Sequence, residues 1–149
     1  MKSPKIKDIK VIFTEPDNIR LIIVKIITDQ DGLYGLGCST FTQRPNPVKY
    51  SIEDYLKPFL IGKDVNNIED IWQSSYVSSY WRNGPVLNNA LSGIDQALWD
   101  IKGKMANMPL YDLLGGKTRE AAAVYVHASG ESNEEVGDKM QAFIEEGFH

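Results

Sequence analysis

The stretch WRNGPVLNNALSGIDQALWDIKGKMANMPLYDLLGG, from Trp81 to Gly116, decides the fold of this chain. Apolar residues recur along it at steps of four, three, four, three and four, and they are Leu87, Leu91, Ile94, Leu98, Ile101 and Met105. Such steps keep side chains on one face of an α-helix, so the pattern predicts a long amphipathic helix. The small residues Ala90, Gly93 and Ala97 flank this face and allow a neighbouring element to approach the helix backbone closely.

Both ends of this helix carry sequence signals. Gly84-Pro85 marks the start, because the fixed φ of proline and its missing N–H suit the first helical position. Pro109 is predicted to stop the helix, since the residue before a proline is pushed out of the α region. A short apolar turn then leads to Gly115-Gly116. We interpret this pair as the boundary between a first domain, residues 1–116, and a second segment, residues 117–149.

The chain before the helix predicts a sheet. Lys5–Phe13, Arg20–Thr28 and Leu33–Ser39 have the alternation or the β-branched content of strands. Short turns separate them, which favours an antiparallel meander, because parallel pairing needs a crossover of a dozen residues or more. Gly35 and Gly37 in the third strand indicate a close backbone approach or a bulge.

Two further helices are predicted between the sheet and the long helix. The apolar face of the first consists of Val48, Ile52, Tyr55, Leu56 and Phe59. The second is predicted to begin at Asn66, whose side chain would cap it while Glu69 reaches back in a capping box. Three strands followed by helices give an α+β fold class.

A different pattern follows Gly116. Ala121–Ala128 is apolar and predicted to be a strand, and Ser132 with Glu135 forms a second capping box before a helix that Gly147 ends. Strand, short loop and helix are the opening unit of a parallel β/α fold. One such unit cannot cover both of its own faces, so a partner or further chain is expected to supply the rest.

Composition excludes several classes of function. The 149 residues carry a net charge of −4 without a basic cluster, which gives no reason to expect nucleic-acid binding. Cys38 is the single cysteine, so no intramolecular disulfide forms, and a cytoplasmic location fits. The basic N-terminus lacks the apolar core of a secretory signal, and no apolar run approaches the length of a membrane span.

The strongest candidate for chemistry is His127, at the end of the predicted strand 121–128. Barrel enzymes collect their functional groups at the carboxyl ends of their strands, and an imidazole there can donate to a substrate oxygen. The alternative is a histidine satisfied by backbone groups.

Two loops provide further candidates. Thr42, Gln43 and Arg44 can bind hydroxyl or carboxylate groups, unless this is an ordinary polar surface loop. Tyr80 and Trp81, expected at the end of a helix, could wall a pocket for a sugar-like ligand or pack at a helix junction.

Other polar residues are interpreted without a catalytic role. The charged residues of the long helix are expected in salt bridges, and they are Asp95, Asp100, Lys102 and Lys104. Cys38 is interpreted as a packing residue. The sequence contains no metal-ligand cluster, phosphate-binding glycine motif or Ser/His/Asp arrangement. From the residues alone, the function stays at a polar ligand near His127.

Several segments together resemble the enolase superfamily, specifically its mandelate racemase/muconate lactonizing enzyme group. The resemblance rests on the predicted meander, on LIGKDVNNIEDIW (Leu60–Trp72) and above all on SGIDQALWDIKGKMANMPLYDLLGG (Ser92–Gly116). YWRNGPV (Tyr80–Val86) and VYVHASG (Val124–Gly130) are similar to the mannonate/D-galactonate dehydratase subgroup.

This resemblance implies a function for the full-length protein. Residues 1–116 resemble the capping domain of these enzymes, and residues 117–149 the first β-α unit of a (β/α)7β TIM-like barrel. Such enzymes abstract the proton α to a carboxylate, a Mg2+ ion stabilises the enediolate, and the β-hydroxyl leaves. The implied protein is a cytoplasmic, homo-oligomeric lyase of sugar-acid metabolism, acting on mannonate-, galactonate- or gluconate-type substrates.

The resemblance also assigns residues. His127 matches a histidine that contacts the substrate, Thr42 the position of a contacting asparagine, and Tyr80 and Trp81 aromatic residues near the pocket. The loop reads GCSTFTQRP here and GDATLNGRE in the dehydratases, so Gln43 is expected to take over the contact that the shorter Thr42 loses.

The Mg2+ ligands and the catalytic bases are expected beyond residue 149, so the 149-residue chain alone is predicted to be inactive. The alternatives are a non-catalytic or very weakly active sugar-acid-binding or regulatory relative, and a short interaction module, which the unpartnered β-α unit argues against.

Overall fold

A computed structural model describes residues 3–148 and divides the chain into two compact units, residues 1–116 (unit 1) and 117–149 (unit 2). The strands of unit 1 are β1 (Ile6–Thr14), β2 (Leu21–Thr28) and β3 (Tyr34–Cys38), with a 3-10 turn, η1 (Pro16–Asn18), between the first two. Its helices are α1 (Pro45–Tyr50), the π-helical η2 (Ser51–Leu56), α2 (Lys57–Leu60), α3 (Ile68–Val77), α4 (Pro85–Ala106) and α5 (Leu110–Leu113). Unit 2 contains α6 (Asn133–Glu145).

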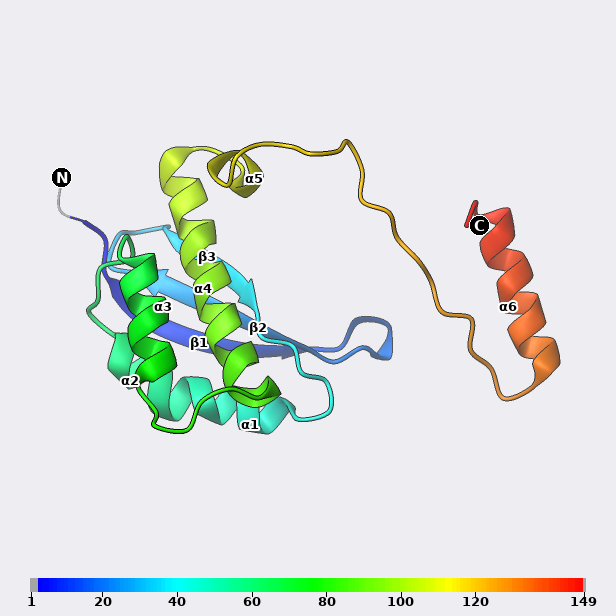
Figure 1. The fold of residues 1–149 in the computed structure, drawn as a ribbon, viewed down its shortest axis with the longest axis horizontal. Helices are drawn as coiled ribbons and strands as arrows, with labels where there is room; N and C mark the ends of the chain where they lie inside the picture. Colours follow the sequence, from blue (N-terminus) through cyan, green and yellow to red (C-terminus); the bar gives the residue numbers. More distant parts are fainter. Residues whose placement is uncertain (1–2, 149) are drawn as a thin grey trace. The chain divides into compact units, whose positions relative to one another are not determined.

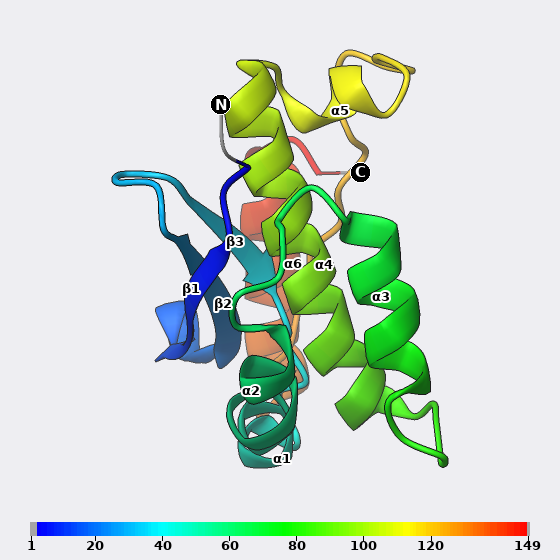
Figure 2. The same ribbon diagram turned by 90° about the vertical axis from the view of Figure 1, so that its left-hand side faces the viewer.

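The sheet of unit 1 is the predicted meander. Its order is β1-β2-β3, both pairs are antiparallel, and α4 lies across one face of the sheet (Figures 1 and 2). Between Ile6 and Asp8 the register with β2 shifts by one residue. This bulge explains why Ile6 and Ile9, an odd number of positions apart, are both buried. The α+β fold class is therefore confirmed.

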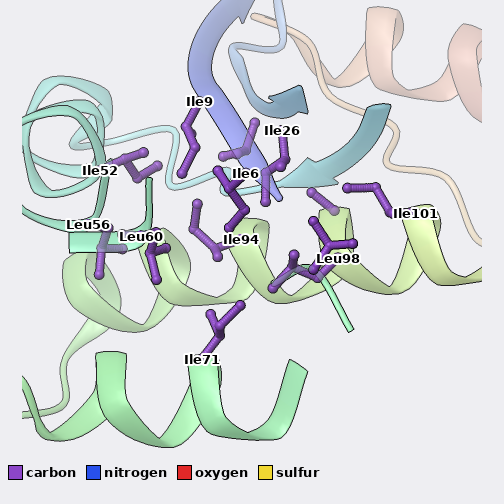
Figure 3. Close-up of a cluster of buried hydrophobic side chains, with 14 of the residues drawn as sticks. Ile6, Ile9, Ile26, Ile52, Leu56, Leu60, Ile71, Ile94, Leu98 and Ile101 are labelled. Atoms are coloured by element: carbon purple, nitrogen blue, oxygen red, sulfur yellow. The ribbon is translucent and has the colours of Figure 1, made fainter. Parts of the chain in front are cut away.

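The predicted long helix is confirmed as α4, and its apolar face forms the centre of the core. Ile94, Leu98 and Ile101 are fully buried, and side chains from the sheet, from η2 and α2 and from α3 point toward them (Figure 3). Its end differs from the prediction. Asn107 adopts the left-handed conformation with φ 51° and closes the helix, with the Met108 N–H donating to the Gly103 carbonyl at 3.0 Å. Pro109 therefore follows the stop and does not cause it.

The small residues of α4 and β3 bring helix and strand into backbone contact. A Cβ atom added to Gly37 would lie 2.0 Å from the Gly93 carbonyl oxygen, and one added to Gly35 would lie 1.9 Å from the Ala97 carbonyl oxygen. Neither distance is sterically allowed, so only glycine fits at these two positions of β3. The predicted close approach is confirmed, and it brings the polar side chains of α4 within reach of the strand backbone.

The chain between β3 and α3 differs from prediction in its register. Val48, Ile52, Leu56 and Leu60 are buried, whereas Tyr55 and Phe59, which were predicted on the apolar face, are exposed. Four-residue steps drift around a helix with 3.6 residues per turn, and the wider π turn of η2 keeps these side chains on one face. Pro58 follows this turn, and its ring and missing N–H disfavour a regular α-helix there.

The predicted capping box at Asn66 is wrong. α3 begins at Ile68 without a side-chain cap, and the Asn66 amide instead donates to the Ser3 hydroxyl at 2.7 Å. Lys102 Nζ donates to the Asn66 side-chain oxygen at 2.9 Å. Asn66 therefore ties the N-terminal segment and α4 to the connection before α3.

In unit 2, described by itself, the predicted helix forms and the predicted strand does not. The Ser132 hydroxyl accepts from the Glu135 N–H at 3.2 Å, so the second N-cap is confirmed, while the Glu135 carboxylate accepts from the Glu131 N–H at 2.8 Å. Residues 121–128 form no strand. A strand requires a hydrogen-bonded neighbour, and this segment pairs with no other strand among the described residues.

No helix within residues 3–148 combines the length and the apolar character needed to cross a membrane.

Candidate functional site

The loop after β3 carries Thr42 and Gln43, and its base is fixed to β2. The Ser39 N–H donates to the Ile22 carbonyl at 2.8 Å, and the Thr40 hydroxyl accepts from the Ile22 N–H at 3.0 Å. Further along, the Arg44 N–H donates to the Phe41 carbonyl at 3.1 Å and closes a turn. Thr42 and Gln43 lie at this turn with exposed side chains, so their hydroxyl and amide groups are available to a ligand.

Cys38 does not have the packing role that the sequence indicated. The residue is exposed, and its thiol donates to the Thr40 hydroxyl at 3.1 Å. It lies on the face of the sheet opposite α4, because Gly37 takes the α4-facing position and side chains alternate along a strand. The thiol therefore contributes to the base of the Thr42–Gln43 loop.

Tyr80 and Trp81 lie in the connection between α3 and α4, because α3 ends at Val77, earlier than predicted. The two residues are 87% and 81% exposed, and their rings pack edge to face with centroids 5.3 Å apart. Neither ring is packed into unit 1, so the interpretation of these residues as packing at a helix junction is wrong for this unit. They are two large aromatic surfaces available to a ligand or a partner.

Hydrogen bonds hold this aromatic connection in place. The Ser79 hydroxyl donates to the Trp81 carbonyl at 2.6 Å, and the Tyr76 hydroxyl donates to the Asn83 side-chain oxygen at 2.9 Å. Asn83 has φ 76°, a left-handed conformation that asparagine tolerates better than most residues. The Arg82 guanidinium lies 5.7 Å from the Tyr76 ring centroid, within the range of a cation–π contact.

A cavity of about 410 Å3 opens beside this connection. This volume lies within the range of small-molecule pockets. Among its lining residues are Tyr55, Ser75, Tyr76, Trp81, Arg82 and Leu91. The Ser75 hydroxyl is buried and has no hydrogen-bond partner among the described residues. Thr42 and Gln43 do not line the cavity, so it brings together only part of the predicted site.

His127 belongs to unit 2 and lies in the extended segment before α6. Its imidazole is exposed and contacts the Tyr125 ring edge to face, with centroids 5.0 Å apart. An imidazole that packs on an aromatic ring and remains exposed can still offer a ring nitrogen to a ligand.

Two charged residues of α4, Asp100 and Lys104, bond to the backbone of β3. Asp100 accepts from the Leu36 N–H at 2.8 Å and forms the expected ion pair with Lys104, whose Nζ also donates to the Tyr34 carbonyl at 2.9 Å. Asp95 differs, because burial raises its pKa and the nearby Glu69 carboxylate adds to the effect. Acid/base chemistry is not assigned to these side chains.

Gln96 is a residue that the sequence did not single out. Its side-chain oxygen accepts from the Cys38 N–H at 3.1 Å, and its amide nitrogen lies 3.4 Å from the Cys38 carbonyl and 2.9 Å from the Ser92 hydroxyl. The signal was present, because Gln96, Asp100 and Lys104 recur every four residues and must share one face of the helix.

The resemblance implies Mg2+, so the donor groups of this chain matter. Among residues 3–148 no group of three or more His, Cys, Asp or Glu side chains is arranged to hold a metal ion. Mg2+ prefers several oxygen ligands, mainly carboxylates and water. The described part of the chain therefore does not fit a metal centre of its own.

Comparisons with known proteins connect these features. A 58% identical D-galactonate dehydratase family member of Salmonella virchow (strain SL491) matches over 148 residues, which are 99% of this chain and 36% of that protein. A D-galactonate dehydratase family member of Pantoea ananatis (strain LMG 20103) is 61% identical over 143 residues, or 96% of this chain and 34% of that protein. The chain thus spans about a third of the length of the curated relatives it matches.

Solved structures agree. A crystal structure of an enolase from Pantoea ananatis with bound D-gluconate and Mg aligns with a TM-score of 0.88 and 60% identity, covering 97% of this chain and 35% of that one. A putative dehydratase from Zymomonas mobilis aligns with a TM-score of 0.71 and 39% identity, covering 79% of this chain and 31% of that one.

The family model of the mandelate racemase/muconate lactonizing enzyme N-terminal domain matches residues 2–115, nearly the whole of unit 1. With this match and the fold described above, the chain belongs to the mandelate racemase/muconate lactonizing enzyme family of the enolase superfamily.

Proposed function

We propose that the full-length protein is a Mg2+-dependent sugar-acid dehydratase and that this chain supplies substrate contacts to it. The observation that carries the proposal is the 60% identity over 97% of the chain to an enolase crystallised with D-gluconate and Mg. The D-galactonate dehydratase family names of the curated relatives support the same class of substrate. The reaction is abstraction of the proton α to the carboxylate and loss of the β-hydroxyl.

In this proposal unit 1 is a capping domain and unit 2 is the beginning of a (β/α)7β barrel. The strand that residues 121–128 do not form alone would then pair with strands from the remainder of the barrel. We assign the metal ligands and the catalytic bases to the part of the relatives that this chain does not match, because the chain spans about a third of their length. Therefore no step of the reaction is assigned to a metal on this chain.

The side chains of this chain suit a polyhydroxylated acid. The Thr42 hydroxyl both donates and accepts, and the Gln43 amide offers two donors and an acceptor, which match the alternating demands of neighbouring sugar hydroxyls. The His127 imidazole offers one further donor or acceptor. We assign these three side chains to hydrogen bonds with the substrate.

Tyr80 and Trp81 are assigned to closure of the pocket. Their exposed rings can cover the C–H surface of a sugar acid and exclude water from it. Exclusion of water lowers the local dielectric constant and strengthens every electrostatic contact to the substrate.

The proposal is tested with a chimera in which residues 1–149 replace the matching part of the Pantoea ananatis enolase. Identity of 60% across this part makes correct assembly a reasonable expectation. Loss of water is measured on a panel of C5 and C6 acid sugars that includes D-gluconate, D-mannonate and D-galactonate. Turnover of at least one of them is expected, and a folded chimera that dehydrates none contradicts the proposal.

Single substitutions in the chimera then test the contacts. His127→Ala is expected to lower kcat/KM by about 10- to 100-fold, because it removes a hydrogen bond made in the substrate complex. Glu134→Gln, in the first turn of α6, is the matched control and is expected to leave kcat/KM unchanged.

A second candidate function is a sugar-acid-binding protein with little or no catalysis. It is favoured by the loop GCSTFTQRP, in which Thr42 replaces a longer asparagine and Cys38 replaces an aspartate of the dehydratases. Calorimetry that detects binding of an acid sugar to a chimera without turnover would support this candidate over the first.

A further inference from the structure

We propose that Gln96 is a positioning residue, which fixes the end of β3 and through it the loop that carries Thr42 and Gln43. This inference rests on the proposed function in one respect: that function assigns the loop to substrate contact.

β3 lies at an edge of the sheet. Among residues 3–148, β3 pairs with no strand other than β2, so the N–H and carbonyl groups on its other side have no strand partner. Side chains of α4 take these groups in order. Lys104 donates to the Tyr34 carbonyl at 2.9 Å, Asp100 accepts from the Leu36 N–H at 2.8 Å, and Gln96 bonds to Cys38.

These contacts have the two-residue period of a strand. Along β3 the bonded residues are two apart, and along α4 their partners are four apart. Four residues of an α-helix rise by about 6 Å, close to the rise of about 6.7 Å over two residues of a strand. The helix therefore stands in for a fourth strand, and the backbone contact at Gly37 and Gly93 brings it near enough to do so.

Gln96 occupies the end of this ladder nearest the candidate loop. It is the member of the ladder whose side chain both accepts from and donates to one backbone unit, at 3.1 and 3.4 Å from Cys38. The Ser92 hydroxyl, 2.9 Å from the Gln96 amide nitrogen, restrains the orientation of this amide. An amide can perform both functions at once, which a carboxylate or an ammonium cannot.

The loop base is consequently held from two sides. On the β2 side it is held by the bonds of Ser39 and Thr40 to Ile22. On the α4 side it is held by Gln96 through Cys38. If the Gln96 bonds to Cys38 are removed, the bonds of Ser39 and Thr40 to Ile22 remain. The loop is therefore expected to lose order while the fold persists.

The experiment uses the 149-residue chain and needs no ligand. Amide hydrogen exchange and peak positions are followed by NMR in the wild type and in Gln96→Met, which keeps the size of the side chain and removes both hydrogen bonds to Cys38. Exchange at the Cys38 and Arg44 amides is expected to accelerate by about tenfold, the factor that corresponds to about 1.4 kcal/mol. The signals of Thr42 and Gln43 are expected to shift, and the amides of β2 and α4 to remain protected.

Three further variants separate positioning from general stability. Gln96→Glu retains the acceptor for the Cys38 N–H and is expected to restore most of the protection. Ser92→Ala removes only the restraint on Gln96 and is expected to give an intermediate loss. Asn89→Met is the matched control, because the Asn89 side chain bonds to the Pro85 carbonyl within α4 and not to the sheet; it is expected to leave the loop unchanged.

The inference is overturned if Gln96→Met leaves the loop signals and the Arg44 exchange unchanged, or if Asn89→Met alters them equally. Neither result depends on whether the chimera is active. Failure of this inference is therefore distinguishable from failure of the proposed dehydratase activity.

Discussion

Gly37→Ala tests the packing on which the whole of unit 1 depends. The added Cβ would lie 2.0 Å from the Gly93 carbonyl oxygen and 2.8 Å from the Ala97 backbone nitrogen. Both are backbone atoms of α4, so no side-chain rotation relieves the clash. An ordinary carbon–oxygen contact is about 3.4 Å, and α4 must therefore retreat by more than about 1 Å.

The cost follows from what this retreat breaks. Overpacking of a core costs about 1–3 kcal/mol. The hydrogen bonds that Gln96 and Asp100 make to β3 lengthen as well, and each contributes about 1 kcal/mol net. Replacement of glycine by alanine reduces the conformational entropy of the unfolded chain, which stabilises the folded state by at most about 1 kcal/mol. The expected loss is therefore about 2–4 kcal/mol.

Urea unfolding followed by tryptophan fluorescence measures this loss, because Trp72 and Trp99 lie in unit 1. Gly137→Ala is the matched control, since its Cβ would meet no atom within 4 Å and it lies inside α6. The control is expected to stabilise α6 slightly. A Gly37→Ala variant within about 0.5 kcal/mol of the wild type would refute the claim that backbone contact sets the spacing of helix and sheet.

Three other predictions concern charge and activity. Asp95→Asn is expected to stabilise the chain at pH 7, because burial and Glu69 raise the pKa of this carboxyl in the folded state. This penalty is fully present above the folded pKa, so the gain should vanish in urea titrations below the ordinary aspartate pKa of about 3.9. Asp8→Asn should have the opposite effect. The hydrogen bond from Lys57 lowers the pKa of Asp8, and the stability it contributes above pH 4 or so is lost as the pH falls through the folded value. The two side chains are 36% and 33% exposed, so solvent screens the pair and the loss at pH 7 should be below about 1 kcal/mol. The 149-residue chain incubated with Mg2+ and D-gluconate should form no dehydrated product in a keto-acid assay, and turnover by this chain would refute the assignment of the catalytic groups to other sequence.

Much of unit 1 could be predicted because its sequence signals are local. The apolar period of α4 extends from Leu87 to Met105, and the glycines of β3 mark the position of the close contact with α4. Short turns between strands leave little choice of topology. Hydrophobic periodicity and turn length are patterns among residues that are close in the sequence. They can therefore be recognised without knowledge of the tertiary structure.

The errors arose where a distant group decided the local structure. Asn66 has the pattern of a capping residue, yet Ser3 and Lys102 occupy its side chain. The four-residue steps from Val48 to Leu60 suit a regular helix less well than a π turn, and Pro58, which follows that turn, disfavours a regular α-helix there. Tyr55 was consequently placed on the wrong face.

The candidate site is the part that sequence predicted least completely. Thr42, Gln43, Tyr80 and Trp81 are exposed, as ligand-binding groups must be, but exposure alone assigns no ligand. The role of Gln96 depends on the distance between a helix and a strand edge, which no local pattern contains. The strand at residues 121–128 depends on hydrogen-bond partners that are absent from the described residues.

The most direct test of the account is a crystal structure of the chimera with D-gluconate and Mg2+. We expect a ring nitrogen of His127 to lie within about 3.2 Å of a substrate oxygen. We also expect the Thr42 hydroxyl or the Gln43 amide to contact the same molecule. An imidazole packed against hydrocarbon, or a substrate that touches neither residue of the loop, would contradict it.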